Sequence, residues 1–354
     1  MNKIIDILKK KKSIPLDEFI NVSLYDKKFG YYMKKNPFGK EGDFITSPII
    51  SKLFSEMIAI WCVSFWEHLK KPKKILIVEL GPGDGSLCKD LLKTFEKFDI
   101  FYKSLKINLL EKSIKLKKIQ QSNINNKNVS WIKSIDEIEY GPVIFLSNEF
   151  FDALPIKQMY KKGSRLFEKH VSLSNKTNEL EFLYKKTTNK LIKYPDALKF
   201  SSSTNIIEYP IVAIEYLISI AKKIKKFNGS VLTCDYGYIE SSGKNTLKAI
   251  GKHKFKNIFL QPGSSDISSH VNFKLFSQIL KKNNLDVKKI ITQSEFLQKM
   301  GIIERANILS RRMTFKSKTN MYFRLKKLLD SNEMGNIFKV LYAKKKGKNF
   351  SIGF

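Results

Sequence analysis

Apolar and polar residues follow one another in a pattern that predicts secondary structure most clearly from residue 74 onward. Short apolar runs such as "KILIVEL" are followed by stretches such as "SLCKDLLKTFEKF", whose apolar positions lie three and four residues apart. The first pattern is typical of a buried strand and the second of an amphipathic helix. The strands expected here span residues 74–80, 105–113, 127–135 and 141–155, with helices at 86–98 and 114–121. This alternation predicts an α/β fold with a Rossmann-like, parallel, doubly wound sheet.

The N-terminal part has a different pattern, because residues 15–26 and 47–71 keep helical spacing throughout. Between them lies "KFGYYMKKNPFGKEGDFITSP", which is rich in glycine, proline and aromatic residues and fits no helical or strand period. Long irregular segments in compact domains are usually functional, commonly as lids or binding loops. We therefore expect an N-terminal helical and lid region.

Beyond Pro155 the alternation of strands and helices is interrupted. Strand-like runs at 156–174 and 180–188 predict an inserted antiparallel β element, and residues 238–270 predict an inserted irregular segment. Helices are expected at 206–227 and 272–283, with a strand at 231–237. The C-terminal end, which contains "LDVKKIITQ", further helices and "IFKVLYAKK", could close the sheet with a final strand. The expected organisation is an N-terminal region (1–70), the first half of the core (71–160), the inserted β element (161–205) and the second half of the core (206–354).

Composition narrows the class of protein. With 354 residues, 42% apolar and 12% aromatic, the chain can bury a substantial core and is globular. No apolar run approaches the roughly 20 residues of a membrane helix, and the N-terminus resembles neither a signal peptide nor a transit peptide. The cysteines Cys62, Cys88 and Cys234 are scattered without a metal-binding spacing, so no metal is expected. These features predict a cytoplasmic protein in a reducing compartment.

The formal net charge of +32 raises the possibility of a polyanion partner. Only five of the 65 basic residues are arginine, however, and the lysines are spread over the whole chain. Arginine is the residue that nucleic-acid sites favour, because its planar fork binds bidentately. The charge is therefore interpreted as a solvated lysine surface with no specific nucleic-acid partner.

A glycine-rich turn follows the first predicted strand of the core. Glu79 ends that strand, and Gly81, Gly83 and Gly85 follow at alternate positions. The carboxyl edge of an open α/β sheet is where ligands bind. The spacing is not the G-x-G-x-x-G of a dinucleotide site, and Glu79 would repel a pyrophosphate. The turn predicts a ligand that carries a cationic group and no phosphate.

The spacing E-x-G-x-G-x-G resembles the first turn of class I S-adenosylmethionine-dependent methyltransferases. In those enzymes an acid at the end of the second strand binds the ribose hydroxyls, and Glu111 in "NLLEKS" stands there. The resemblance implies S-adenosyl-L-methionine as cofactor. It also implies that Glu79, Gly81, Gly83, Gly85 and Glu111 bind it.

Further blocks resemble the MidA-like methyltransferases, the family of the mitochondrial complex I assembly methyltransferase. They include "VELGPGDGSL", "LSNEFFDALPIKQM", "CDYGY", "GSSDISSHVNF" and "EMGNIFKVL", and the resemblance runs from about residue 17 to 343. It implies dimethylation of an arginine on a quinone-site, peripheral-arm subunit of NADH:quinone oxidoreductase, in the bacterial cytoplasm. A homodimer is a further expectation. Asn272 stands where the family usually has Asp.

The methyl acceptor is expected at the end of the fourth strand, in "SNEFFDALP". Enzymes that methylate base amino groups typically carry N-P-P-Y there, whereas this chain carries carboxylates. A carboxylate binds a guanidinium through charge-assisted, bidentate hydrogen bonds. Glu149 is therefore the first candidate for a catalytic residue and Asp152 the second, although Asp152 could instead cap the turn. Asn148 is expected to contact the cofactor.

Two expectations concern more distant segments. Phe44 and Thr46, in "GDFITSP", would fold over the cofactor and exclude water, although Phe44 could equally anchor the helix that follows. His270, in "SSHVNF", could orient a carboxylate or the acceptor, or could be a structural histidine.

Two other functions remain open from the sequence. An RNA or small-molecule methyltransferase would use the same cofactor turn. The absence of N-P-P-Y and of a platform that interleaves arginine with aromatic residues disfavours RNA. A non-catalytic assembly scaffold could retain the fold alone, and the intact glycines and Glu111 disfavour it.

Overall fold

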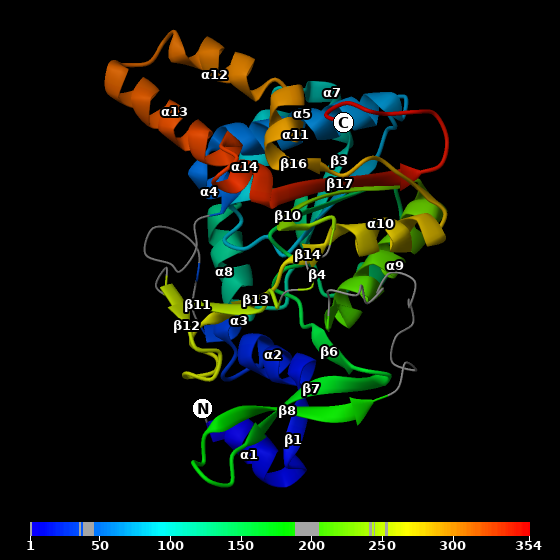
Figure 1. Ribbon diagram of the computed structural model, residues 1–354. Helices are drawn as coiled ribbons and strands as arrows, with labels where there is room; N and C mark the ends of the chain where they lie inside the picture. The colour runs from blue at the N-terminus through cyan, green and yellow to red at the C-terminus, as the bar shows by residue number, and fades with distance from the viewer. Residues whose placement is uncertain are drawn as a thin grey trace.

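The computed structural model describes residues 2–34, 37, 46–187, 205–240, 243, 245–251 and 254–354. Its largest sheet has the strand order β15, β17, β10, β5, β2, β3, β4 (Figure 1). These strands are β2 (Ile75–Leu80), β3 (Leu105–Leu110), β4 (Val129–Ile132), β5 (Val143–Asn148), β10 (Gly229–Tyr238), β15 (Leu285–Val287) and β17 (Phe338–Lys345). The short strands β14 (Val271–Asn272) and β16 (Ile291–Thr292) pair with β10 and β17.

The strand order confirms the predicted doubly wound sheet and locates its crevice. Strands β2, β3, β4, β5 and β10 pair in parallel, and β17 alone of the seven runs antiparallel to its neighbours. The chain moves from β2 toward β3 and β4, and then returns to the other side of β2 with β5 and β10. The reversal makes the carboxyl ends of β2 and β5 a topological switch point, where open α/β sheets bind ligands.

Helices cover both faces of this sheet because successive residues of each strand point to opposite faces. Ile75 and Ile77 of β2 pack with one set of helices, whereas Leu76 and Val78 pack with the other. The first set includes α5 (Lys52–His68), α6 (Ser86–Phe95), α7 (Asp99–Ser104) and α11 (Gln293–Lys299). The second set consists of α9 (Ile211–Phe227), α10 (Phe273–Lys282) and the 3-10 turn η1 (Ile135–Glu137). Among the helices described, none combines the length and apolar character needed to cross a bilayer.

A second sheet lies below the first in Figure 1 and contains the inserted strands. Its members are β1 (Ser13–Pro15), β6 (Lys157–Lys162), β7 (Arg165–Leu173), β8 (Leu180–Thr187) and β9 (Ile206–Tyr209). The N-terminal helices α1 (Asn2–Lys11) and α2 (Leu16–Tyr25) share a core with it through Ile4, Phe19 and Val171. The N-terminal segment therefore packs on the insertion as well as on the main sheet, where α5 lies.

Three secondary-structure predictions are wrong. Residues Ile206–Tyr209 form strand β9 instead of the first turn of a helix, because Pro210 follows them and α9 begins only at Ile211. The N-terminal region, predicted as helical, contains strand β1. The segment expected to be irregular contains a three-stranded sheet of β11 (Lys248–Gly251), β12 (Lys254–Lys256) and β13 (Asp266–Ser268). Strands this short carry too few residues for a period of two to be recognised.

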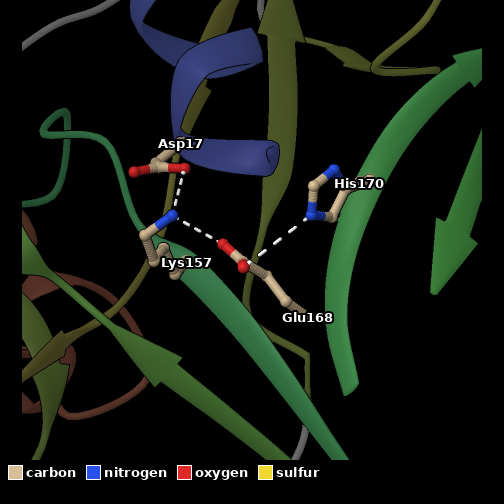
Figure 2. A network of polar contacts seen from close by, with 4 residues as sticks. All are labelled: Asp17, Lys157, Glu168 and His170. Atoms are coloured by element: carbon tan, nitrogen blue, oxygen red, sulfur yellow. Dashed lines mark hydrogen bonds and ion pairs between the residues drawn. The ribbon is translucent and has the colours of Figure 1, made fainter. Parts of the chain in front are cut away.

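A network of charged side chains connects α2 to the inserted sheet (Figure 2). The ammonium of Lys157 lies 3.0 Å from Asp17 Oδ1 and 2.5 Å from Glu168 Oε1, and His170 Nε2 lies 3.7 Å from Glu168 Oε2. Burial disfavours the Glu168 carboxylate, but Glu168's interactions with His170 and Lys157 outweigh burial and lower its pKa. A carboxyl with a lowered pKa stabilises the fold above its unfolded pKa, and this contribution is lost as the pH falls through the folded pKa.

We expect Glu168→Gln to lower the free energy of unfolding at pH 7 by about 2 kcal/mol, because a hydrogen bond to a charged group is lost in a buried network. Below about pH 4.3, the unfolded value, the difference between the variant and the parent protein should shrink. Denaturant titrations across this range measure both effects. Glu18→Gln, which breaks the exposed pair with Lys11, is the control and should change stability by less than about 0.5 kcal/mol.

Candidate active site

A cavity of about 400 Å³ lies at the switch point formed by the carboxyl ends of β2 and β5. It is bounded by the glycine turn after β2, the ends of β3 and β5, helix α2, and the segment that carries β11 and β13. The short helices α3 (Tyr31–Lys34) and α14 (Met334–Ile337) complete the wall. The residues discussed below that line it are Tyr25, Tyr32, Thr46, Gly81, Gly83, Glu111, Glu149, Asp152, Tyr236, Lys248 and Asp266.

The glycine turn requires glycine for two reasons. Gly81, Gly83 and Gly85 have φ angles of 62°, 58° and 84°, a region that favours glycine. A Cβ on Gly81 would lie 2.6 Å from the Phe150 ring, and one on Gly85 would lie 2.7 Å from Ile124. Gly81 and Gly83 line the cavity, whereas Gly85 lies beyond it as the N-cap of α6. The first two glycines therefore allow a ligand to approach the backbone, and the third allows close packing.

Glu111 is held at the end of β3 by two donors. The Ser113 N–H donates to Oε1 at 2.7 Å, and the Gln120 amide donates to Oε2 at 3.0 Å. Gln120, on α8 (Ile114–Asn123), also donates to the Gly83 carbonyl at 2.8 Å, so one side chain joins the acid to the glycine turn. Burial raises the pKa of Glu111. Gln120 follows Glu111 by nine residues and was not predicted as a site residue.

Glu79 and Asn148 line a smaller cavity of about 40 Å³ on the other side of the glycine turn. This cavity shares Thr46, Gly83 and Glu149 with the larger one. Burial, with a smaller effect from Asp84, raises the pKa of Glu79 to about 8. Glu79 Oε2 and Asn148 Oδ1 are buried without a hydrogen-bond partner among the described residues. Two unpaired acceptors at this point fit a ligand with hydrogen-bond donors or a positive charge.

The turn after β5 is organised by a residue that the sequence analysis did not single out. Asp235, near the end of β10, is completely buried and accepts the Phe150 and Phe151 N–H groups at 3.1 and 2.9 Å. Burial raises the pKa of Asp235 to about 7. Glu149 immediately precedes Phe150 and has a φ angle of 53°, which is uncommon for a residue other than glycine. Strained backbone of this kind is concentrated at functional sites.

Glu149 lies where the two cavities meet. Its Oε1 accepts the Asn148 amide at 3.0 Å and the Ser47 N–H at 3.3 Å, the latter from the start of α4 (Ser47–Ile50). Burial raises its pKa to about 7, and the nearby charge of Asp235 adds to the effect. Glu149 therefore lines both cavities from the turn after β5, and its predicted catalytic role stays a prediction.

Two aspartates and three tyrosines form the end of the cavity beyond Glu149. Asp152 is buried, and burial together with the charges of Asp235 and Asp266 raises its pKa well above the usual range. Asp266 accepts the Tyr32 hydroxyl at 2.7 Å. The rings of Tyr25 and Tyr32 are stacked with centroids 5.6 Å apart, and Tyr236 lines the same space. We call Asp152, Asp266, Tyr25, Tyr32 and Tyr236 the acidic-aromatic end.

The remaining predicted site residues have different positions. Thr46 lines the cavity from the N-terminal side, and Phe44 lies outside the described residues. His270 does not line the cavity. Its ring lies edge-on against the Tyr236 ring, with centroids 5.1 Å apart. Asn272 caps α10 by accepting the Leu275 N–H. This structural role does not require the charge of an aspartate. No group of His, Cys, Asp or Glu side chains in the described ranges is arranged to hold a metal ion.

The fold and the cavity together define a class I S-adenosyl-L-methionine-dependent methyltransferase. The strand order with one antiparallel strand, the glycine turn after β2, the acid after β3 and the unpaired Glu79 oxygen fit this cofactor. The family model of S-adenosyl-L-methionine-dependent methyltransferases matches residues 57–291. The chain belongs to that family, and S-adenosyl-L-methionine is its methyl donor.

Named relatives cover most of the chain. "Protein arginine methyltransferase NDUFAF7, mitochondrial" from Xenopus laevis is 28% identical over 87% of this chain and 76% of its own length. The Caenorhabditis elegans homolog of the same name is 30% identical over 85% and 76%. A methyl transferase superfamily member from Burkholderia thailandensis, crystallised with S-adenosyl-homocysteine, has the same fold, with a TM-score of 0.82, 20% identity and coverage of 98% and 92%.

We expect Glu111→Ala to weaken S-adenosyl-L-methionine binding about ten- to a hundredfold, because hydrogen bonds to a charged acceptor are lost. Calorimetric titration measures the affinity, and a thermal melt confirms that the variant is folded. The control is Glu67→Ala, which removes an exposed acid from α5 and should leave the affinity unchanged. An affinity within twofold of the parent protein would show that Glu111 does not bind the cofactor.

Proposed function

We propose that this chain is a protein arginine N-methyltransferase whose acceptor binds at the acidic-aromatic end of the cavity. The observation that carries the proposal is the convergence of Glu149, Asp152 and Asp266 on one cavity beside the glycine turn. These acids raise one another's pKa because their like charges repel. A guanidinium relieves this repulsion and can hydrogen-bond two carboxylates at once.

The tyrosines favour a planar, weakly hydrated cation over a compact one. Arginine stacks on aromatic faces, and its charge is attracted to the ring quadrupole. The rings of Tyr25 and Tyr32 are held in place, because their hydroxyls donate to the Ala153 carbonyl and to Asp266. Two lysines line the cavity, with the Lys248 ammonium 4.4 Å from the centre of the Tyr236 ring and the Lys112 ammonium 5.7 Å from that of Tyr25. A bound guanidinium would lie against the acids of the cavity, next to Lys248.

The residues at one end of the site would bind the cofactor, and those at the other end would bind the methyl acceptor. When bound, S-adenosyl-L-methionine supplies an electrophilic methyl group on a sulfonium. Glu79 and Asn148 would hold its amino-acid end, and Glu111 its ribose hydroxyls. Glu149 would orient the attacking guanidinium nitrogen and accept its proton, because the Glu149 carboxyl has a pKa near 7. Holding both reactants in line can supply roughly 7 to 11 kcal/mol of the barrier. Thr46 would help to exclude water from the N-terminal side of the cavity.

Protein arginine is favoured as the acceptor by the names of the relatives in addition to the chemistry of the site. The family resemblance suggests the quinone-site, peripheral-arm subunit of NADH:quinone oxidoreductase as the substrate, dimethylated to support assembly of that complex. The deciding experiment is mass spectrometry of this subunit from cells with and without the gene. An arginine that carries two methyl groups should lose both in the deletion strain.

A second measurement separates this proposal from other acceptors. The purified chain is incubated with methyl-labelled donor and fractionated cell extract from the deletion strain. Label in arginine of a protein supports the proposal, whereas label in RNA or in a small molecule contradicts it. Cofactor binding without any transfer would instead indicate a non-catalytic scaffold.

A further inference from the structure

A helical hairpin projects from the body of the molecule next to the cavity. It consists of α12 (Ile302–Ser310) and α13 (Phe315–Leu329), and Figure 1 shows it extending away from the main sheet. Arg305 anchors it through Glu56 at 2.7 Å. Helix α13 also packs on α4 and α14, two elements that lie at the edge of the cavity. We call residues 302–329 the α12–α13 hairpin.

The charge of this hairpin differs from that of the rest of the chain. The hairpin contains eight lysines and arginines and a single acidic residue, Glu304. Four of the five arginines of the whole chain lie here, at positions 305, 311, 312 and 324. Two of them are engaged within the protein, because Arg305 pairs with Glu56 and Arg324 donates to Asn320 Oδ1 and to the Ile50 carbonyl. The other two, Arg311 and Arg312, point to an anionic partner, since the fork of arginine binds phosphate bidentately. Arg311 and Arg312, at the turn between the helices, are exposed.

Large apolar side chains accompany these charges and are also exposed. Phe315 is 86% exposed, Phe323 60% and Ile308 55%, and Met313 and Ile303 are exposed as well. A stripe along α13 alternates rings with cations, since Phe315, Lys318, Tyr322, Phe323 and Lys326 lie around one surface hollow. Exposed apolar groups at this density indicate an interaction site. The cations that lie between these rings are lysines, Lys318 and Lys326.

We propose that the α12–α13 hairpin binds the surface of an anionic lipid bilayer, independently of the methyl acceptor. A basic helix with exposed phenylalanines lies in the interface plane, with its rings in the acyl boundary and its cations on the headgroup phosphates. The apolar groups occur on both helices and at the turn of a hairpin that projects from the body of the molecule. A fluid bilayer accommodates such a projection without needing a matching shape.

The charge and shape of the hairpin disfavour two other occupants. A second copy of the chain would bring its own basic hairpin against this one, because the patches of a two-fold interface are identical. That arrangement would be repulsive. Single-stranded RNA binds by stacking bases on rings, and the aliphatic side chains Ile303, Ile308 and Met313 offer no ring. Lipid tails accept aliphatic and aromatic groups alike.

The test is flotation of the purified full-length protein with two kinds of vesicle at about 0.15 M ionic strength. We expect binding to phosphatidylcholine vesicles that contain phosphatidylglycerol, and little binding to phosphatidylcholine alone. The double variant Arg311→Gln/Arg312→Gln should lower the partition coefficient about thirtyfold. Phe315→Ser/Phe323→Ser should lower it by a similar factor. All four side chains are exposed, so thermal melts and cofactor affinity should not change.

The controls remove positive charges or an exposed apolar side chain from helices outside the hairpin. Lys222→Gln/Lys225→Gln, on α9, deletes two charges, and Ile100→Ser, on α7, deletes an exposed apolar group. Both controls should float like the parent protein. Equal losses in the controls and in the hairpin variants would overturn the proposal, because diffuse lysines would then explain binding. It is also overturned if the parent protein does not float, or if the hairpin variants abolish RNA binding or self-association and leave flotation unchanged.

Discussion

Glu149→Gln is expected to bind S-adenosyl-L-methionine with unchanged affinity and to transfer methyl groups about a hundred- to a thousandfold more slowly. The amide keeps the shape of the carboxylate and loses the charge that orients the guanidinium, and the loss of one preorganised electrostatic contact has this magnitude. Single-turnover transfer to an arginine peptide measures the rate, and calorimetry measures the affinity. A matched control is Glu56→Gln, which changes an acid at the base of the α12–α13 hairpin, outside the cavity.

The pH dependence of Glu149 offers an independent readout. Because burial and Asp235 raise the pKa of Glu149 to about 7, the ionised form appears only as the pH rises through that value. We expect kcat/KM, which reports the free enzyme, to rise through about pH 7 and then level off. The inflection of kcat should lie lower, since a bound cation stabilises the carboxylate.

Interacting acids titrate as a group, so the inflection is assigned by comparing variants. It should disappear in Glu149→Gln and persist in Asp152→Asn. Full activity of Glu149→Gln, with the inflection unchanged, would contradict the role of Glu149. Slower transfer accompanied by an equal loss of cofactor affinity would place Glu149 in the cofactor site alone.

The sequence was sufficient for the main sheet because its strands are continuous apolar runs with long helices between them. Strands β2 and β5 lie within the predicted ranges 74–80 and 141–155 for this reason, although β5 ends at Asn148. Local patterns fail where an element is short or where a single residue overrides them. Pro210 divides a stretch that otherwise has helical spacing, and β1 has only three residues whose partner lies far away in β7.

The candidate site shows the same limit. Glu111 and Glu149 could be predicted because each directly follows a strand of the core. Asp235 and Asp266 could not, since their importance depends on a turn more than eighty residues away and on Tyr32 near the N-terminus. A signal was nevertheless present, because "CDYGY" places an acid near the end of a strand that was correctly predicted. Acids at strand ends deserve the same consideration wherever the strands are parallel neighbours.

The inserted sheet and the N-terminal helices have a common role in this arrangement. Helix α2 carries Tyr25 to the acidic-aromatic end, and the Lys157 network fixes the other end of α2 through Asp17. The insertion therefore supports one wall of the proposed acceptor site from outside the methyltransferase core. This explains why the wall cannot be recognised from the core sequence alone.

Gly83→Val is expected to weaken S-adenosyl-L-methionine binding at least about a hundredfold. Gly83 has a φ angle of 58° and lines both cavities, so a branched side chain there would be strained and would project into space that the cofactor needs. The Gly83 carbonyl also accepts Gln120, which in turn holds Glu111. Distortion of the turn would therefore reach the ribose-binding acid as well.

The control for backbone strain is Gly163→Val. Gly163 has almost the same φ angle, 57°, and lies between β6 and β7, where an added Cβ would meet no atom within 4 Å. Both variants should lose similar stability, about 1 to 3 kcal/mol for a branched residue in this conformation. Only Gly83→Val should lose cofactor affinity, measured by calorimetry below the melting temperature of both. If Gly83→Val binds the cofactor within twofold of the parent protein, or if Gly163→Val loses affinity equally, the glycine turn after β2 is not where the cofactor lies.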